Sequence, residues 1–171
     1  EMTGWGSHGV AQVQGALGMD AAGPIEVWTE SGKIEPLKYT APEPKTRGDG
    51  ICSKPKVFFR YPGDIIMELG DGPPGGAIFI GEKGRVTIDR GIFKSDPPEL
   101  AEEALTHKTP GFVFSHQRNW IDCIRSRQQP VASAEVGHRS ATVCHFGNIA
   151  RWVGRKLRWD PVKEEFPGDA E

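Results

Sequence analysis

The sequence predicts an α+β domain, a mostly antiparallel open sheet with helices packed on one face. Three observations predict it. Apolar and polar residues alternate in short runs between residues 24 and 93, which is typical of half-buried strands. From His116 onward the apolar residues recur with the period of a helix, and another helical stretch precedes the strands. A length of 171 residues suits one domain, which we expect to span residues 1–171.

The predicted elements are bounded by turn and cap residues. Gly18 suits the C-cap of the first helix, and Ser133 suits the N-cap of the last one. The stretch 35–55, rich in Pro, Gly, Lys and Thr, is predicted to be a surface excursion. In order, we expect a helix at 9–17, strands at 24–29, 56–61, 65–69, 77–80, 85–89 and 92–93, helices at 116–127 and 133–155, a strand at 156–159 and a polar tail.

Composition and charge exclude several classes of protein. With 37% hydrophobic residues, 26% charged residues and a net charge of −2, the chain has no basic excess for binding nucleic acid. It has no apolar run of about 20 residues that could cross a membrane. Its three cysteines include no C-x-x-C pair, which argues against disulfides and structural zinc. We therefore expect a cytoplasmic protein, although the residues before Glu1, which would carry an export signal, are missing.

Two glycine-rich segments are predicted to be turns. GDGPPGG at 70–76 and GEKG at 81–84 do not lie between a strand and a helix N-terminus, where a nucleotide phosphate would bind. We therefore expect these residues to bind no cofactor. His138 and His145 share a helix face without Cys or carboxylate partners at ligand spacing, so no metal site is predicted either.

The turn GWGSHG delivers His8 to the start of the first helix. The positive end of the helix dipole favours a neutral imidazole, which can accept a proton as a general base. A capping or packing histidine fits the same spacing, and this alternative stays open. Arg60 and Tyr61 stand at a strand end before a Pro-Gly turn, where they would reach a ligand or simply form the surface of a hairpin.

Several stretches together resemble one known family: GWGSHGVAQVQGALGMD with GPIEVW, GGAIFIGEKGRVTIDRG, and NWIDCIRSRQQPVASAEVGHRSATVCHFGNIARWVGRKLRWDP. They resemble the C-terminal domain of the glucose–fructose oxidoreductase/inositol dehydrogenase (Gfo/Idh/MocA) family. The closest similarity is to a bacterial subgroup common in planctomycetes. The resemblance covers nearly the whole chain.

The resemblance implies a two-domain enzyme in which an N-terminal Rossmann domain, absent from these residues, binds NAD or NADP. Hydride would pass between the nicotinamide and a carbon of a sugar, cyclitol or related polyol. A Glu-Lys-Pro lysine of the Rossmann domain and an Asp-x-x-x-His pair would handle the proton, and His8 falls on that histidine. Trp5, Arg60 and Tyr61 are the expected substrate contacts.

The family's aspartate falls on Gly4, which can neither hydrogen-bond a substrate nor orient the imidazole. Two alternatives therefore accompany the oxidoreductase prediction. One is an NAD-assisted glycosidase, because such relatives also carry a His-Gly pair like His8-Gly9. The other is a non-catalytic oligomerisation or binding module. We expect the 171 residues to be inactive alone, to hold no cofactor, and to form a homo-oligomer through the open sheet face, built on Phe58, Ile78 or Ile80.

Overall fold

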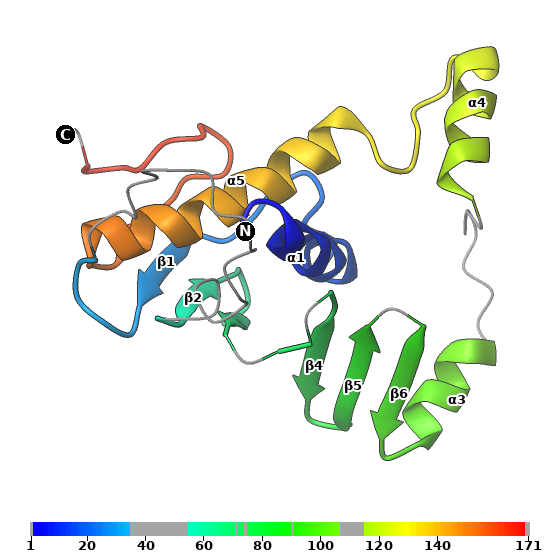
Figure 1. Cartoon of the computed structure of the whole chain (residues 1–171), viewed down its shortest axis with the longest axis horizontal. Coiled ribbons are helices and arrows are strands. Elements are labelled where there is room, and N and C mark those ends of the chain that lie inside the picture. Colours follow the sequence, from blue (N-terminus) through cyan, green and yellow to red (C-terminus); the bar gives the residue numbers. More distant parts are fainter. Residues whose placement is uncertain are drawn as a thin grey trace, which may run out of the picture.

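Two antiparallel sheets and a pair of packed helices make up the main body of the chain (Figure 1). The computed structural model describes residues 2–34, 55–70, 72–73, 75–89, 91–106 and 115–169, apart from the side chains of Trp5, Ala104 and Leu105. The elements are α1 (Trp5–Ala16), β1 (Glu26–Thr29), β2 (Val57–Arg60), β3 (Ile66–Leu69), β4 (Ala77–Gly81), β5 (Gly84–Asp89), β6 (Ile92–Asp96), α3 (Glu99–Thr106), α4 (His116–Ser126), α5 (Ala134–Val153) and β7 (Leu157–Arg158).

The strands form a first sheet in the order β3-β2-β1-β7 and a second sheet in the order β4-β5-β6. Every pairing is antiparallel, which confirms the α+β class. The expectation of one continuous sheet is wrong. The alternation of apolar and polar residues identifies a strand but not the strand with which it pairs. In the structure β4 pairs with β5 and with no strand of the first sheet.

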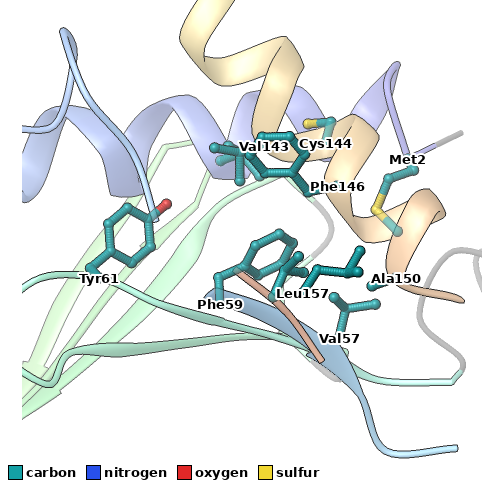
Figure 2. Close-up of a cluster of buried hydrophobic side chains, with 11 residues drawn as sticks. Met2, Val57, Phe59, Tyr61, Val143, Cys144, Phe146, Ala150 and Leu157 are labelled. Atoms are coloured by element: carbon teal, nitrogen blue, oxygen red, sulfur yellow. The ribbon is translucent and has the colours of Figure 1, made fainter. Parts of the chain in front are cut away.

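The core lies between the first sheet and the helices α1 and α5 (Figure 2). Val57 and Phe59 alternate along β2 with the less buried Phe58 and Arg60, so one face of the strand points at α5. Val10 of α1 and Val143 of α5 close the same core. The other fully or nearly fully buried apolar side chains of this cluster are Met2, Val27, Tyr61, Cys144, Phe146, Ala150 and Leu157.

The first residues of the chain are anchored in this core. Met2 is 4% exposed, and a Cβ added to Gly147 of α5 would lie 2.9 Å from its Cε atom. Gly147 therefore provides the space that the Met2 side chain occupies. Because Met2 precedes α1 by only a short turn, this contact fixes the start of α1 relative to α5.

Helix α5 has a defined residue at each end. Ser133 accepts a hydrogen bond from the Val136 amide (3.3 Å), which confirms the predicted N-cap. Gly154 ends the helix at φ 72°, and a Cβ there would lie 2.2 Å from the Lys33 nitrogen. Both the positive φ and the close approach require glycine.

Replacing Ser133 with Ala is expected to lower the free energy of unfolding by about 1 kcal/mol, because the Val136 amide loses its capping acceptor. Urea denaturation measures the loss. Ser126→Ala is the matched control: its hydroxyl bonds back to the Asp122 carbonyl of the same helix and accepts only a long bond (3.4 Å) from the Gln128 amide, so the change is expected to be near zero. An equal loss in both variants would contradict the capping role.

Other sequence expectations need correction. Helix α1 begins at Trp5 rather than Gly9, and the short helix α3 was not predicted. The polar tail contains Phe166, which packs against Phe146 and Trp159 with ring centroids 5.2 and 4.8 Å apart. The predicted excursion at 35–55 lies outside the described residues except for Pro55, whose carbonyl accepts two hydrogen bonds from the Arg151 guanidinium. No helix in the described ranges is long and apolar enough to cross a membrane.

Candidate functional site

His8 is an exposed residue at the end of the first turn of α1. Gly4 is the N-cap of this helix, so Trp5 is its first helical residue and His8 its fourth. Val10 and Gln14, one turn apart, face the core and are almost completely buried. The imidazole therefore lies on the solvent side of a helix whose opposite side is held by packing.

The loop before β4 is fastened to α1 directly beside His8. A Cβ added to Gly9 would lie 2.8 Å from the Gly76 carbonyl oxygen, so the helix and the loop approach as closely as backbone allows. Gln12 donates a hydrogen bond from Nε2 to the Gly75 carbonyl at 3.0 Å. These contacts fix the orientation of the helical turn that carries His8.

Gln12 is a site residue that the sequence analysis missed. It follows His8 by four positions, so the two side chains are neighbours on the helix surface. Its Oε1 atom is buried and accepts no hydrogen bond from the described residues. The i, i+4 spacing was visible in the sequence, but the contact with Gly75 that orients the amide was not.

In the glycine-rich loop, Gly76 lies between two backbone segments. A Cβ on Gly76 would lie 1.9 Å from the Ile88 carbonyl oxygen, and Gly76 also closes on Gly9 of α1. Protein backbone therefore approaches Gly76 from two sides, and this glycine has a packing role between α1 and the second sheet.

Gly4 and Trp5 begin the helix that carries His8. The Gly4 carbonyl accepts hydrogen bonds from the amide of Ser7 (3.2 Å) and from its hydroxyl. The first turn contains no acidic residue, and the N-cap contributes no side-chain hydrogen bond. Trp5 has its backbone in the helix, and its side chain lies outside the description. Its predicted contact with substrate stays a prediction.

The structure does not bring Arg60 and Tyr61 to His8. Arg60 lies on the outer face of the first sheet, where its guanidinium bonds to Glu26 (3.1 Å) and Asp64 (2.7 Å). Tyr61 is 0% exposed and lies among the core side chains (Figure 2). This burial argues against the expected contact between Tyr61 and a substrate.

Burial also governs the acidity of Tyr61 and Cys144. It raises the pKa of the Tyr61 phenol well above its ordinary value, with a smaller contribution from Cys144. It raises the pKa of the Cys144 thiol to about 11. Both groups stay protonated at neutral pH, so neither supplies a base or a nucleophile.

The two histidines of α5, His138 and His145, do not form a metal site with other described residues. Nε2 of His138 lies 2.9 Å from a carboxylate oxygen of Glu164, and this hydrogen bond holds the pKa of Glu164 below its ordinary value. His145 is exposed. In the part of the chain that the structure describes, no three residues of the types His, Cys, Asp and Glu lie close enough to hold a metal.

The outer face of the first sheet carries stacked aromatic and charged side chains. Trp28 and Phe58 lie opposite each other on β1 and β2, with ring centroids 5.5 Å apart and planes at 14°. Lys156 lies 4.2 Å from the centre of the Trp28 ring and bonds to Glu26 (3.1 Å), which lowers the pKa of Glu26. Helices α1 and α5 pack on the opposite face, and among the described residues no helix covers this face.

The arrangement around His8 suits proton transfer. An exposed imidazole on a fixed helix can exchange a proton with a substrate that approaches from outside this domain.

A comparison with protein families gives one match that covers almost the whole chain. The family model described as "Oxidoreductase family, C-terminal alpha/beta domain", of the Gfo/Idh/MocA type, matches residues 2–171. No curated protein and no solved structure matches the chain.

Proposed function

Because the chain belongs to the C-terminal alpha/beta domain family of the Gfo/Idh/MocA oxidoreductases, we propose that it is the substrate-side domain of an NAD(P)-dependent oxidoreductase. The proposed substrate is a sugar, a cyclitol or a related polyol. The observation that carries the proposal is the exposed His8 on a helix that is fixed by Gly9–Gly76 and Gln12–Gly75 contacts. Residues 1–171 alone are proposed to be inactive, because their sequence contains no Glu-Lys-Pro lysine.

Oxidation of a hydroxyl-bearing carbon removes a hydride and a proton. The chemistry that a nicotinamide cofactor would supply, if bound by another domain, is the acceptance of that hydride. The contribution of this chain is the proton: an imidazole nitrogen of His8 accepts it from the substrate hydroxyl and returns it in the reverse reaction. Gln12, one turn further along α1, donates to the Gly75 carbonyl and so positions the helical turn that presents that imidazole.

The proposal is tested by nucleotide titration and activity of the complete protein. We expect the complete protein to bind NADH or NADPH and to reduce the oxidised cofactor with at least one member of a polyol panel. The 171-residue chain is expected to do neither. A complete protein that binds no nicotinamide would favour the non-catalytic module instead.

Gly4→Asp is expected to raise the free energy of unfolding by about 0.5 kcal/mol, because a carboxylate at the N-cap binds helix amides and complements the dipole. The same carboxylate, one turn before His8, would favour the imidazolium. We therefore expect the acidic limb of the pH–rate profile of the complete enzyme to move to higher pH. Gly4→Asn is the matched control, because it caps the helix without adding charge: it should stabilise without moving the profile. A profile unchanged by Asp would show that His8 is not the titrating group.

An NAD-assisted glycosidase is the second candidate, and the absence of a carboxylate at Gly4 favours it. The close approach of the Gly76 carbonyl already requires glycine at position 9, so the His8-Gly9 pair is not independent support for the glycosidase. A panel of chromogenic glycosides separates the candidates. Release of the aglycone without net accumulation of NADH would favour the glycosidase over the dehydrogenase.

We also propose that the chain forms a homo-oligomer through a sheet face without helices. Phe58 lies on the outer face of the first sheet, where it stacks on Trp28. Ile78 and Ile80, which are 38% and 76% exposed, alternate along β4 with the buried Ala77. Light scattering at micromolar concentration measures the mass, and a monomer would contradict this proposal.

A further inference from the structure

The second sheet ends beside the helix that carries His8. In Figure 1, α1 lies at the end of this sheet where β4 begins and β5 ends, and α1 contacts β4. Asp89 is the last residue of β5 and is partly buried. The fold therefore brings an acidic residue to the end of the sheet that approaches α1.

Gly76 connects Asp89 with the first turns of α1. In the register that pairs Ala77 with Ile88, Gly76 comes opposite Asp89, and a Cβ added to Gly76 would lie 2.7 Å from the Asp89 Cα atom. The carbonyl oxygen of the same glycine lies 2.8 Å from the position of a Cβ on Gly9. Because Gly9 follows His8 directly, a single glycine separates Asp89 from the neighbour of His8.

Helix α1 itself brings no carboxylate to this place. Its first turn contains no acidic residue, and its N-cap is Gly4. Asp89 comes from a different element, so the charge is supplied by the folding of β5 against α1 and not by the helix sequence. A carboxylate that tertiary contacts hold beside an exposed imidazole is a candidate for contact with the same substrate.

We propose that Asp89 is a substrate-binding residue, which accepts a hydrogen bond from the hydroxyl next to the one that His8 deprotonates. The inference rests on the proposed function and narrows its substrate class. A hydrogen bond to an ionised carboxylate is about twice as strong as one between neutral groups. The negative charge also disfavours a substrate that carries a carboxylate of its own. The preferred substrate is therefore a neutral polyol with adjacent hydroxyls, and not a sugar acid.

The two elements are held together in a way that suits binding by both side chains. The contacts of Gly9 with Gly76 and of Gln12 with Gly75 fasten α1 to the start of β4, and β4 pairs with β5. Groups that are fixed before the substrate arrives lose little freedom when it binds.

The proposed oligomer interface lies elsewhere along the second sheet. Ile80 pairs with Arg85, close to the β4–β5 turn, whereas Asp89 lies at the opposite end of β5. Ile78 pairs with Thr87, between these two ends. The substrate-binding role of Asp89 therefore does not require the exposed side chain of Ile80.

Asp89→Asn in the complete protein tests the proposal, because it keeps the size of the side chain and removes its charge. With a neutral polyol as substrate, we expect KM to rise about 10–100-fold, the range for a lost hydrogen bond to a charged group. We expect kcat to stay within about threefold, because the bond exists before and during the reaction. Asp89→Glu keeps the charge and is expected to recover part of the lost affinity.

Asp64→Asn is the matched control. Asp64 is an exposed acidic residue in a turn of the first sheet, where it bonds to Arg60, and its φ of 61° suits asparagine. We expect its KM to equal that of the unmodified enzyme. Calorimetric titration with the polyol, in the presence of the reduced cofactor, measures the same differences as Kd without turnover.

A deoxy analogue identifies the hydroxyl that Asp89 binds. In the unmodified enzyme, the analogue that lacks the hydroxyl next to the reacting carbon is expected to have a KM at least about tenfold above that of the parent polyol. In Asp89→Asn, analogue and parent are expected to differ by less than about twofold, because the partner of that hydroxyl is already lost.

The outcomes separate this inference from the function on which it rests. If the complete protein oxidises no polyol, the proposed function fails, and the role of Asp89 fails with it. If polyols are oxidised but Asp89→Asn and Asp64→Asn have the same KM and Kd, only the role of Asp89 is overturned. A full deoxy penalty that persists in Asp89→Asn would also overturn it, as would a loss confined to kcat.

Discussion

Replacing His8 with Ala in the complete oxidoreductase is expected to lower kcat by about 10²–10⁴-fold and to leave the free energy of unfolding almost unchanged. The loss corresponds to about 3–5 kcal/mol of transition-state stabilisation. The reason is that His8 is exposed, so its removal takes away a proton acceptor without opening a cavity. Steady-state kinetics and urea denaturation of the same preparation measure the two quantities.

His145→Ala is the matched control for that variant. This histidine is also exposed, but it belongs to α5 rather than to the helix fixed by the Gly75–Gly76 loop. We expect its kcat to stay close to that of the unmodified enzyme. If His8→Ala had an unchanged kcat, His8 would not be the proton-transfer residue. If the lower kcat came with a large loss in the free energy of unfolding, the role of His8 would be structural.

Phe59→Ala is expected to lower the free energy of unfolding by about 3–5 kcal/mol. The ring is 0% exposed and packs near Gly147 and Met2 beneath α5 (Figure 2). Its removal loses the transfer free energy of the ring and leaves a cavity that the surrounding helices cannot fill completely. Because single domains are stable by only about 5–15 kcal/mol, this is a large fraction of the total. Urea denaturation measures it.

The neighbouring residue supplies the control. Phe58 has the same side chain, but it lies on the outer face of the first sheet against Trp28. Phe58→Ala is expected to cost about 1 kcal/mol, which is typical of a half-buried aromatic pair. If Phe58→Ala were the more damaging variant, the register of β2 would be reversed from the one described here.

Local patterns in the sequence identified most of the elements. The alternation of apolar and polar residues identified the strands. The capping residue Ser133, followed by apolar residues at helical spacing, identified α5. The predicted start of α1, at Gly9, is four residues later than the observed one. The segment from Gly4 to Gly9 has few apolar side chains, and its helical form depends on tertiary contacts. The division into two sheets was not predictable, because strand pairing is decided between segments far apart in the chain.

The burial of Tyr61 was predictable from the alternation along β2. Val57, Phe59 and Tyr61 follow one another at period two, so the face that buries Phe59 also buries Tyr61 and turns Arg60 outward. Reading the two residues as one ligand-binding pair ignored that alternation. A register argument applied to β2 would have placed Tyr61 in the core.

The candidate site was predictable only in part. The position of His8 near a helix start followed from its glycine-rich turn, and the structure confirms that the residue is exposed on α1. The contacts of Gly9 with Gly76 and of Gln12 with Gly75 join segments that are distant in sequence, so no local pattern contains them. They give Gly75 and Gly76 a packing role beside α1.

The central claim is that His8 exchanges a proton with the substrate of an NAD(P)-dependent oxidoreductase. The most direct measurement is the distance from the His8 imidazole to the reacting hydroxyl oxygen, in a crystal structure of the complete protein with nicotinamide cofactor and polyol bound. We predict a hydrogen-bond distance of about 2.6–3.2 Å. A substrate bound with its reacting hydroxyl on another residue, and with His8 facing bulk solvent, would contradict the claim.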